Sequence, residues 1–103
     1  MPTIPEIFRN MPARYRGAGL STPRTYYFSI GDHKYTVRLT PQSCVVEDGK
    51  TVDNADCVLK TTPDLFEGMV LRGKLPGALD IARGRFKTSN VALLQDLPTL
   101  FSF

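Results

Sequence analysis

Residues 25–40 read TYYFSIGDHKYTVRLT, and this stretch decides the fold. On both sides of the central Gly-Asp-His, apolar side chains alternate with polar ones, which is the period of a β-strand with one buried face. The inward positions include Phe28, Val37 and Leu39. A short glycine-containing turn typically joins two antiparallel strands in a hairpin. The stretch therefore predicts a hairpin whose inner face borders the core.

The chain that follows the hairpin predicts two more strands and then helices. Residues 43–47 and 55–61 are short runs rich in apolar and β-branched side chains, which favour strands. Thr62 and Pro63 suit the first positions of a helix. Four apolar residues then recur at helical spacing, namely Leu65, Phe66, Met69 and Val70.

The C-terminal third predicts three further short elements. Residues 76–83 favour a short helix with Leu79 and Ala82 facing inward. Residues 85–89 are a candidate fifth strand, and Asn90 is a good N-cap for a final helix.

The N-terminal segment predicts one more helix. Thr3 and Glu6 have the spacing of a capping box, and apolar residues follow at helical spacing until Pro12, where we expect a kink or a restart. Strands joined by short turns, with helices grouped apart from them, indicate one α+β domain over residues 1–103. We predict a mostly antiparallel five-stranded sheet covered on one face by helices.

Charge and composition exclude several classes of protein. The 103 residues carry a net charge of +3, and cations concentrate in residues 1–24 and 72–87. These clusters suit a solvated face, or a surface facing an anion such as a carboxylate or a membrane. No nucleic-acid motif is present, so we expect no nucleic-acid partner. Two cysteines, no signal peptide and no apolar run long enough to span a membrane favour a cytoplasmic setting.

Side chains suited to catalysis or metal binding are scarce. His33 is the only histidine and lies in the predicted turn, where it has no partner for general-base chemistry. Cys44 and Cys57 fall on different strands, and two thiols with one distant histidine are too few to hold a metal. We therefore expect no cofactor, no metal and no catalytic residue. An enzyme with a cysteine nucleophile is the least favoured alternative.

The last eleven residues are strongly apolar, and their apolar members are Leu93, Leu94, Leu97, Leu100, Phe101 and Phe103. A terminal segment of this kind must dock on the rest of the domain or associate with another surface. It either completes the core or closes an apolar cavity.

Four stretches resemble the sterol carrier protein 2 (lipid-transfer) family. They are residues 7–15 (IFRNMPARY) followed by Gly19 and Leu20, residues 55–60 (ADCVLK), residues 69–76 (MVLRGKLP) and residues 82–87 (ARGRFK). Their order and spacing span nearly the whole chain. The resemblance implies an apolar tunnel between sheet and helices that binds sterols, fatty acids or acyl-CoA without a cofactor. By position, Met69, Phe86, Leu93, Leu97 and Phe101 would face this tunnel, and the inward strand residues named above would complete its lining.

We therefore predict a non-catalytic domain that binds, and can transfer, an apolar ligand. The expected partners are a lipid or fatty acyl chain and a transient membrane-surface contact, and the expected state is a monomer or weak dimer. The alternative is a non-catalytic protein-interaction or dimerisation module whose core is filled.

Overall fold

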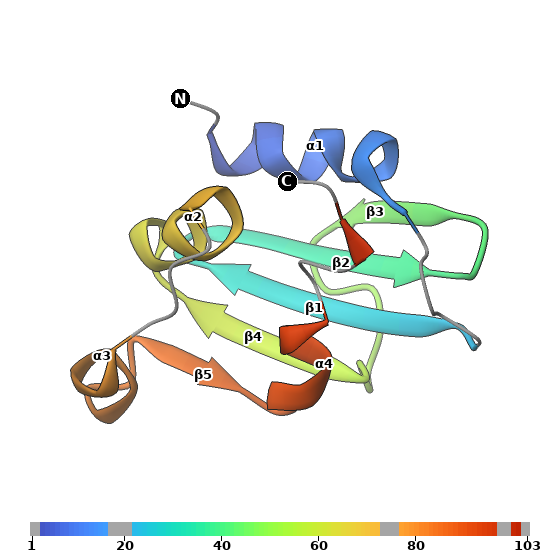
Figure 1. Cartoon of the computed structure of the whole chain (residues 1–103). Coiled ribbons are helices and arrows are strands. Elements are labelled where there is room, and N and C mark those ends of the chain that lie inside the picture. Colours follow the sequence, from blue (N-terminus) through green and yellow to red (C-terminus); the bar gives the residue numbers. More distant parts are fainter. Residues whose placement is uncertain (1–2, 17–21, 73–76, 97–99, 102–103) are drawn as a thin grey trace.

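The computed structural model describes residues 3–16, 22–72, 77–96 and 100–101 (Figure 1). The elements follow the predicted order: α1 (Ile4–Arg14), β1 (Arg24–Ile30), β2 (His33–Leu39), β3 (Cys44–Asp48), β4 (Cys57–Thr61), α2 (Pro63–Arg72), α3 (Ala78–Ala82), β5 (Phe86–Thr88) and α4 (Val91–Gln95). The chain is thus an α+β protein, as the sequence predicts.

The five strands form a single mixed sheet in the order β3-β2-β1-β4-β5. β1 pairs with β2, β2 with β3 and β4 with β5 in antiparallel fashion, but β1 and β4 are parallel, with Phe28 opposite Leu59. The prediction of a mostly antiparallel sheet is therefore wrong at the sheet's centre. The local alternation of residues fixes which face of each strand is buried, but it carries no information about the neighbour of β4.

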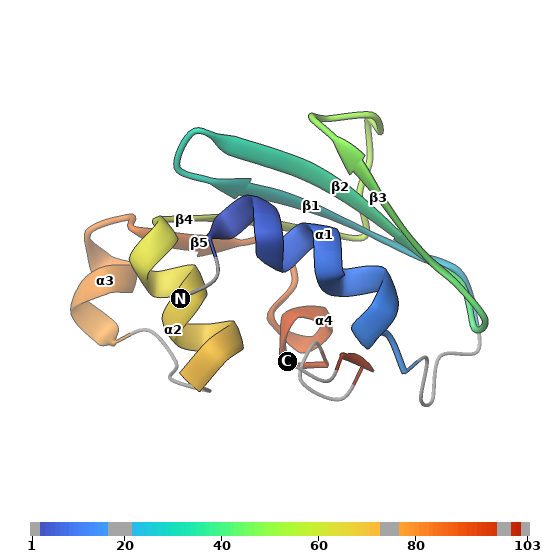
Figure 2. The same cartoon turned by 90° about the horizontal axis from the view of Figure 1, so that it is seen from above.

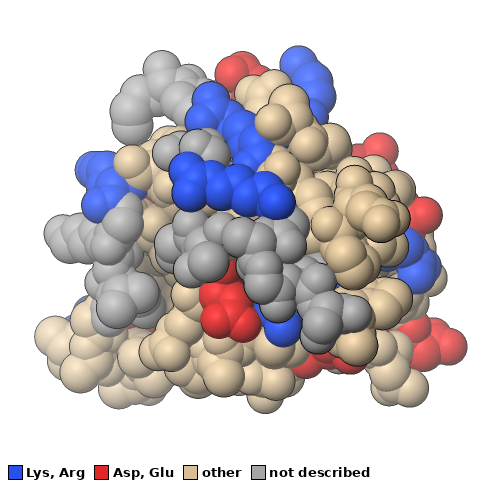
Figure 3. Space-filling view, turned by 45° about the vertical axis from the view of Figure 1, so that its right-hand side comes forward, with Lys and Arg blue, Asp and Glu red and all other residues tan. Residues whose placement is uncertain are grey.

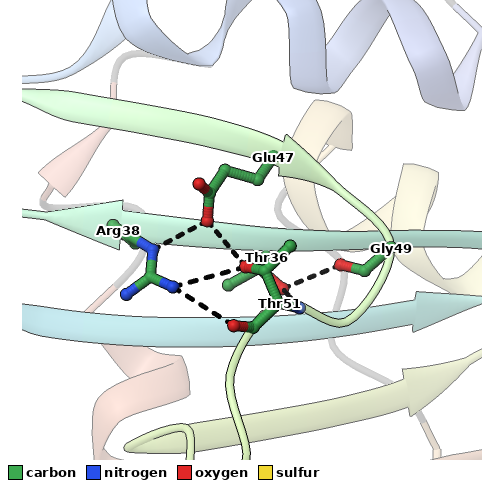
Figure 4. A network of polar contacts seen from close by, with 5 residues as sticks. All are labelled: Thr36, Arg38, Glu47, Gly49 and Thr51. Atoms are coloured by element: carbon green, nitrogen blue, oxygen red, sulfur yellow. Dashed lines mark hydrogen bonds and ion pairs between the residues drawn. The ribbon is translucent and has the colours of Figure 1, made fainter.

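The parallel pair is made possible by the connection between β3 and β4, which crosses the outer face of the sheet. Parallel strands need such a crossover, because no tight turn can join them. Thr36 anchors the crossover: its hydroxyl donates to the Gly49 carbonyl at 2.8 Å and accepts from the Thr51 N–H at 3.1 Å. Arg38 and Thr51 both donate to the Glu47 carboxylate (Figure 4). Thr36, which the alternation places outward, is consequently 0% exposed.

The helices cover the opposite face of the sheet (Figure 2). α1 packs on β2 and β3, α3 packs on β5, and α4 packs on β4. Among the described residues, no pair of helices packs backbone to backbone as closely as these helices pack on the strands. The sheet is therefore the common support of α1, α3 and α4, whereas α2 contributes the Phe66 ring, which meets Phe28 edge-on at 5.8 Å and stacks on Phe8 of α1.

Two local predictions are corrected by the structure. α1 continues through Pro12 to Arg14, so no new helix starts at the proline. Pro12 lies near the C-terminal end, where its missing N–H removes only one bond of the last turn. Leu79 and Ala82 do not face inward, because no residue of α3 is buried. α3 lies at a corner of the molecule beside edge strand β5 (Figure 1).

Candidate functional site

The candidate site is the apolar layer, which we define as the buried side chains between the inner face of the sheet and the helices. Most of the residues predicted to bind a ligand belong to this one continuous cluster, namely Phe28, Val37, Leu39, Met69, Phe86 and Phe101. Leu93 is half-buried and packs against the cluster. Leu97 lies outside the described residues. The sequence thus predicts a set of residues that the fold brings together.

The part of the apolar layer under α1 and α2 is occupied by aromatic rings in contact. The Phe8 ring stacks on Tyr35 with centroids 4.2 Å apart and on Phe66 with centroids 5.4 Å apart. It also meets Phe28 edge-on at 5.2 Å. The described residues therefore display no open tunnel in this half of the layer. Phe8 and Phe66 were not predicted as site residues, although both belong to apolar stripes that the sequence shows.

The other half of the layer is closed by the C-terminal cover, which we define as α4 together with Leu100 and Phe101. Leu94, Leu100 and Phe101 are its buried side chains. The Asn90 side chain caps α4 by accepting from the Leu93 N–H at 3.1 Å, as the sequence predicts. α4 has only five residues, so it owes its stability to this cap and to docking rather than to its own length.

Polar contacts between the C-terminal cover and strand β1 act as a latch. The Tyr26 hydroxyl donates to the Leu93 carbonyl at 2.7 Å. Arg24 donates to the Tyr26 hydroxyl at 3.2 Å and to the Asp96 carboxylate at 3.1 Å. A buried tyrosine usually finds a partner for its hydroxyl, so its inward position in β1 is the one signal in the sequence that foretells this latch.

The far end of the C-terminal cover is held by the segment after α1. The Arg16 N–H donates to the Leu100 carbonyl at 2.7 Å, and the rings of Tyr15 and Phe101 lie 5.3 Å apart. Tyr15 and Phe101 also form an isolated antiparallel bridge. The cover is therefore held at its two ends, by β1 and by the chain that follows α1.

The pKa shifts of Tyr26, Cys57 and Cys44 all favour the neutral side chain. Burial raises the pKa of Tyr26, and the hydrogen bond from Arg24 opposes that rise only in part. Burial likewise raises the pKa of the Cys57 thiol, whose sulfur lies 3.4 Å from the Asn90 carbonyl. Burial raises the pKa of Cys44 to about 11. A thiol is a nucleophile in its ionised form, so neither cysteine is activated at neutral pH.

A surface groove lies outside the apolar layer, between α1 and β3. It has a volume of about 400 Å³ and is lined by Pro5, Phe8, Arg9, Pro12, Tyr35, Val46 and Asp48. Its floor is apolar and its wall carries one cation and one anion. No local sequence pattern predicts this groove, because its residues come from three elements whose packing sets its shape.

Cations gather at the C-terminal end of α1, as the sequence indicates for residues 1–24. Arg9, Arg14 and Arg16 are all exposed. Figure 3 shows Lys and Arg side chains grouped on the side of the molecule that carries this end of α1. In the described part of the chain, no group of three His, Cys, Asp or Glu side chains could hold a metal ion. None of the described helices has the length and apolar character needed to cross a membrane.

Comparison with known protein families and with curated proteins finds no match. Solved structures of similar fold do exist. One is the stereoselective inverting sec-alkylsulfatase Pisa1 from Pseudomonas sp., which superposes with a TM-score of 0.76 over 95% of this chain at 19% identity. A double mutant of that sulfatase superposes with a TM-score of 0.78 over 98% of this chain at 20% identity. The chain spans only 16–17% of those chains. At this identity the likeness is one of fold: the same arrangement of sheet and helices recurs as a small part of a larger enzyme.

Proposed function

We propose that this domain binds a long hydrocarbon chain, as in a fatty acid, an acyl-CoA or a sterol-like lipid, without transforming it. The observation that carries the proposal is the C-terminal cover. It closes an apolar layer with a five-residue helix and a few hydrogen bonds at its ends. The ligand would lie between the inner face of β1 and β4 and the side chains of Met69 and Leu94.

Movement of the C-terminal cover supplies the entry route. α4 is attached to β4, so it can shift while α1 keeps its place on β2 and β3 and Phe66 of α2 keeps its ring contacts with Phe8 and Phe28. The ring cluster around Phe8 stays intact in such a movement, because no residue of the cover takes part in it. The tunnel predicted from the sequence would then be formed by the ligand as it enters.

The hydrophobic effect is sufficient for useful affinity. An acyl chain of about 16 carbons offers about 12 kcal/mol of gross transfer energy at about 0.8 kcal/mol per buried CH₂. Association and ordering cost at least about 4 kcal/mol, which leaves at most about 8 kcal/mol, so a Kd of about 1 μM is the tightest that this balance allows. This balance requires the cover to settle back on the ligand, so that Leu94, Leu100 and Phe101 remain buried.

Two comparisons support the proposal. The resemblance to sterol carrier protein 2 extends over four stretches of the chain. The enzyme that contains the same fold is named for alkyl sulfates, whose substrates carry a hydrocarbon chain.

The test is titration of the delipidated protein with a fluorescent 16-carbon fatty acid. We expect saturable binding near 1 μM for the wild-type chain. Leu94→Trp adds a bulky apolar group to the buried side of α4 and should weaken binding at least about tenfold, by overfilling the layer. Val91→Trp makes a comparable change at a residue of the same helix that is 58% exposed, and should leave binding unchanged. Absence of binding to fatty acids, acyl-CoA and sterols alike, in a protein whose circular dichroism is native, would refute the proposal.

The alternative is an interaction module with a filled core, and the interlocked rings of Phe8, Phe28 and Phe66 favour it. The groove between α1 and β3 would then be the functional surface. Light scattering over a range of protein concentrations separates the two readings. Association that persists after Leu94→Trp but disappears after Val46→Glu, in the groove, would favour the module.

A further inference from the structure

Helix α3 presents large apolar side chains to solvent. Leu79 is 69% exposed and Ile81 is 56% exposed, although a surface helix normally turns such residues toward the core. No residue of this five-residue helix is buried. α3 thus leaves apolar area uncovered at a corner of the molecule, and an exposed apolar patch of this kind typically marks a contact site.

The same corner carries a surplus of positive charge. Arg83, Arg85 and Lys87 follow α3 directly and are all exposed. Asp80 is the only acidic residue of residues 77–90. Its carboxylate accepts from the Gly77 N–H at 3.3 Å and lies 3.9 Å from Arg85. Asp80 and Arg85 therefore offset each other.

Two cations are left to face outward. Among the described residues, neither Arg83 nor Lys87 forms an ion pair. Gly84 closes the turn after α3 with a positive φ of 74°, and a Cβ there would lie 3.2 Å from the Lys87 Cε and 3.6 Å from its Nζ. The Lys87 ammonium group thus lies beside the end of α3. We call Leu79, Ile81, Arg83 and Lys87 the α3 surface.

We propose that the α3 surface docks the domain on a membrane that contains anionic lipids. Exposed apolar side chains next to unpaired cations are complementary to such a surface. The apolar groups enter the boundary between headgroups and acyl chains, while the cations stay at the level of the lipid phosphates. A protein partner of matching charge is the competing occupant, but the apolar part is two side chains on a protruding single turn, which suits shallow insertion better than a flat interface. This inference goes beyond hydrocarbon binding, because membrane attachment is measurable with no ligand in the apolar layer.

Co-sedimentation with lipid vesicles tests the proposal. One set of vesicles is pure phosphatidylcholine, and the other contains about one-third phosphatidylserine. We expect the wild-type chain to sediment with the anionic vesicles and not with the neutral ones. Raising the salt to about 1 M shortens the Debye length to about 3 Å and should release most of the protein.

Paired variants assign the binding to the α3 surface. Leu79→Ser with Ile81→Ser should weaken vesicle binding at least about tenfold, because the apolar contact is lost. Arg83→Gln with Lys87→Gln should weaken it about 25-fold, from about fivefold for each cation near the surface. Val91→Ser is the apolar control on α4, and Arg9→Gln with Lys34→Gln is the charge control. Both controls replace exposed residues distant from α3 in sequence and should change binding by less than about threefold.

Three results would overturn the proposal. The first is absence of wild-type binding to the anionic vesicles. The second is equal binding by the wild type and the Leu79→Ser, Ile81→Ser variant. The third is light scattering that shows this variant turning a dimer into a monomer without vesicles, because the α3 surface would then be an interface between two copies of the chain. Each result is independent of fatty-acid titration, so failure here leaves the proposed hydrocarbon site standing.

Discussion

Replacing Tyr26 with phenylalanine removes the hydroxyl contacts of the latch between β1 and the C-terminal cover, while the buried ring and the ion pair of Arg24 with Asp96 remain. The change deletes one oxygen atom. That oxygen donates to the Leu93 carbonyl at 2.7 Å and accepts from Arg24 at 3.2 Å. The ring still stacks on Phe28, with centroids 5.9 Å apart. Packing in the apolar layer should therefore be nearly unchanged, and the effect should be confined to α4.

The size of the effect follows from the hydrogen bond that is lost. A buried bond of this kind contributes about 1 kcal/mol net. The Leu93 carbonyl still accepts from the Asp96 N–H at 3.3 Å, so no unsatisfied carbonyl adds to this cost. Because each 1.4 kcal/mol is a factor of ten, we expect the opening equilibrium of α4 to rise about fivefold. Faster opening should also speed the exchange of a bound fatty acid, with a smaller effect on its affinity.

Amide hydrogen exchange measures this effect residue by residue. The informative amides are those of Leu94, which donates to the Asn90 carbonyl, and Leu100, which donates to the Asp96 carbonyl. Both should lose protection in Tyr26→Phe, while the amides of β2 keep theirs. Tyr27→Phe is the matched control, because it removes the same atom from the next residue, on the outer face of the sheet. Equal protection of Leu94 and Leu100 in wild type, Tyr26→Phe and Tyr27→Phe would show that the latch does not hold the cover.

Four further predictions concern the core and its ionisable groups. Phe8→Ala should lower the free energy of unfolding by about 3–5 kcal/mol in urea, because the 0% exposed ring contacts three other rings; a loss below about 1 kcal/mol would contradict the packing described. Thr61→Val should raise that free energy by about 1 kcal/mol, because the buried Thr61 hydroxyl has no hydrogen-bond partner among the described residues; destabilisation would instead reveal a partner that this hydroxyl needs. The Cys44 thiol, whose pKa is raised to about 11, should react slowly with a disulfide reagent at pH 7–8 in the folded protein and rapidly in urea, and equal rates would contradict its burial. Folding raises the pKa of Tyr26, so the neutral Tyr26 side chain contributes its full stabilisation at pH values below the ordinary tyrosine pKa of about 10. This contribution is lost as the pH rises through the raised pKa of the folded state. Stability should thus fall more steeply above pH ~10 in the wild type than in Tyr26→Phe, and equal slopes would argue against this assignment.

The local elements could be predicted because their signals lie in short stretches of sequence. Alternation around the turn predicts β1 and β2, and their register pairs Tyr26 with Val37 as a hairpin requires. Asn90 predicts the start of α4, and its side chain does accept from the Leu93 N–H. These features depend on neighbours in sequence, so periodicity and capping preferences suffice to find them.

The predictions that were wrong concern features that depend on contacts between residues distant in sequence. The parallel pairing of β1 and β4 follows from a crossover anchored by Thr36 and Thr51, and nothing in the strand sequences encodes that route. The outward position of Leu79 results from the place of α3 beside an edge strand, where no core lies behind it. Of the eight residues predicted for the candidate site, six lie in the buried cluster, and their contact with a ligand stays a prediction. The sequence-based prediction misses the latch, because the partner of Tyr26 is a backbone carbonyl 67 positions away.

The most direct test of the proposed hydrocarbon site is an isotope-filtered NMR experiment with ¹³C-labelled palmitate bound to the unlabelled protein. Our account predicts magnetisation transfer from the acyl methylenes to the methyl groups of Leu59, Met69 and Leu94, which belong to one buried cluster. Contacts confined to Pro5 and Val46 would place the ligand in the groove beside α1 instead. Contacts to no buried methyl group at all would contradict the claim that hydrocarbon enters between the sheet and its helices.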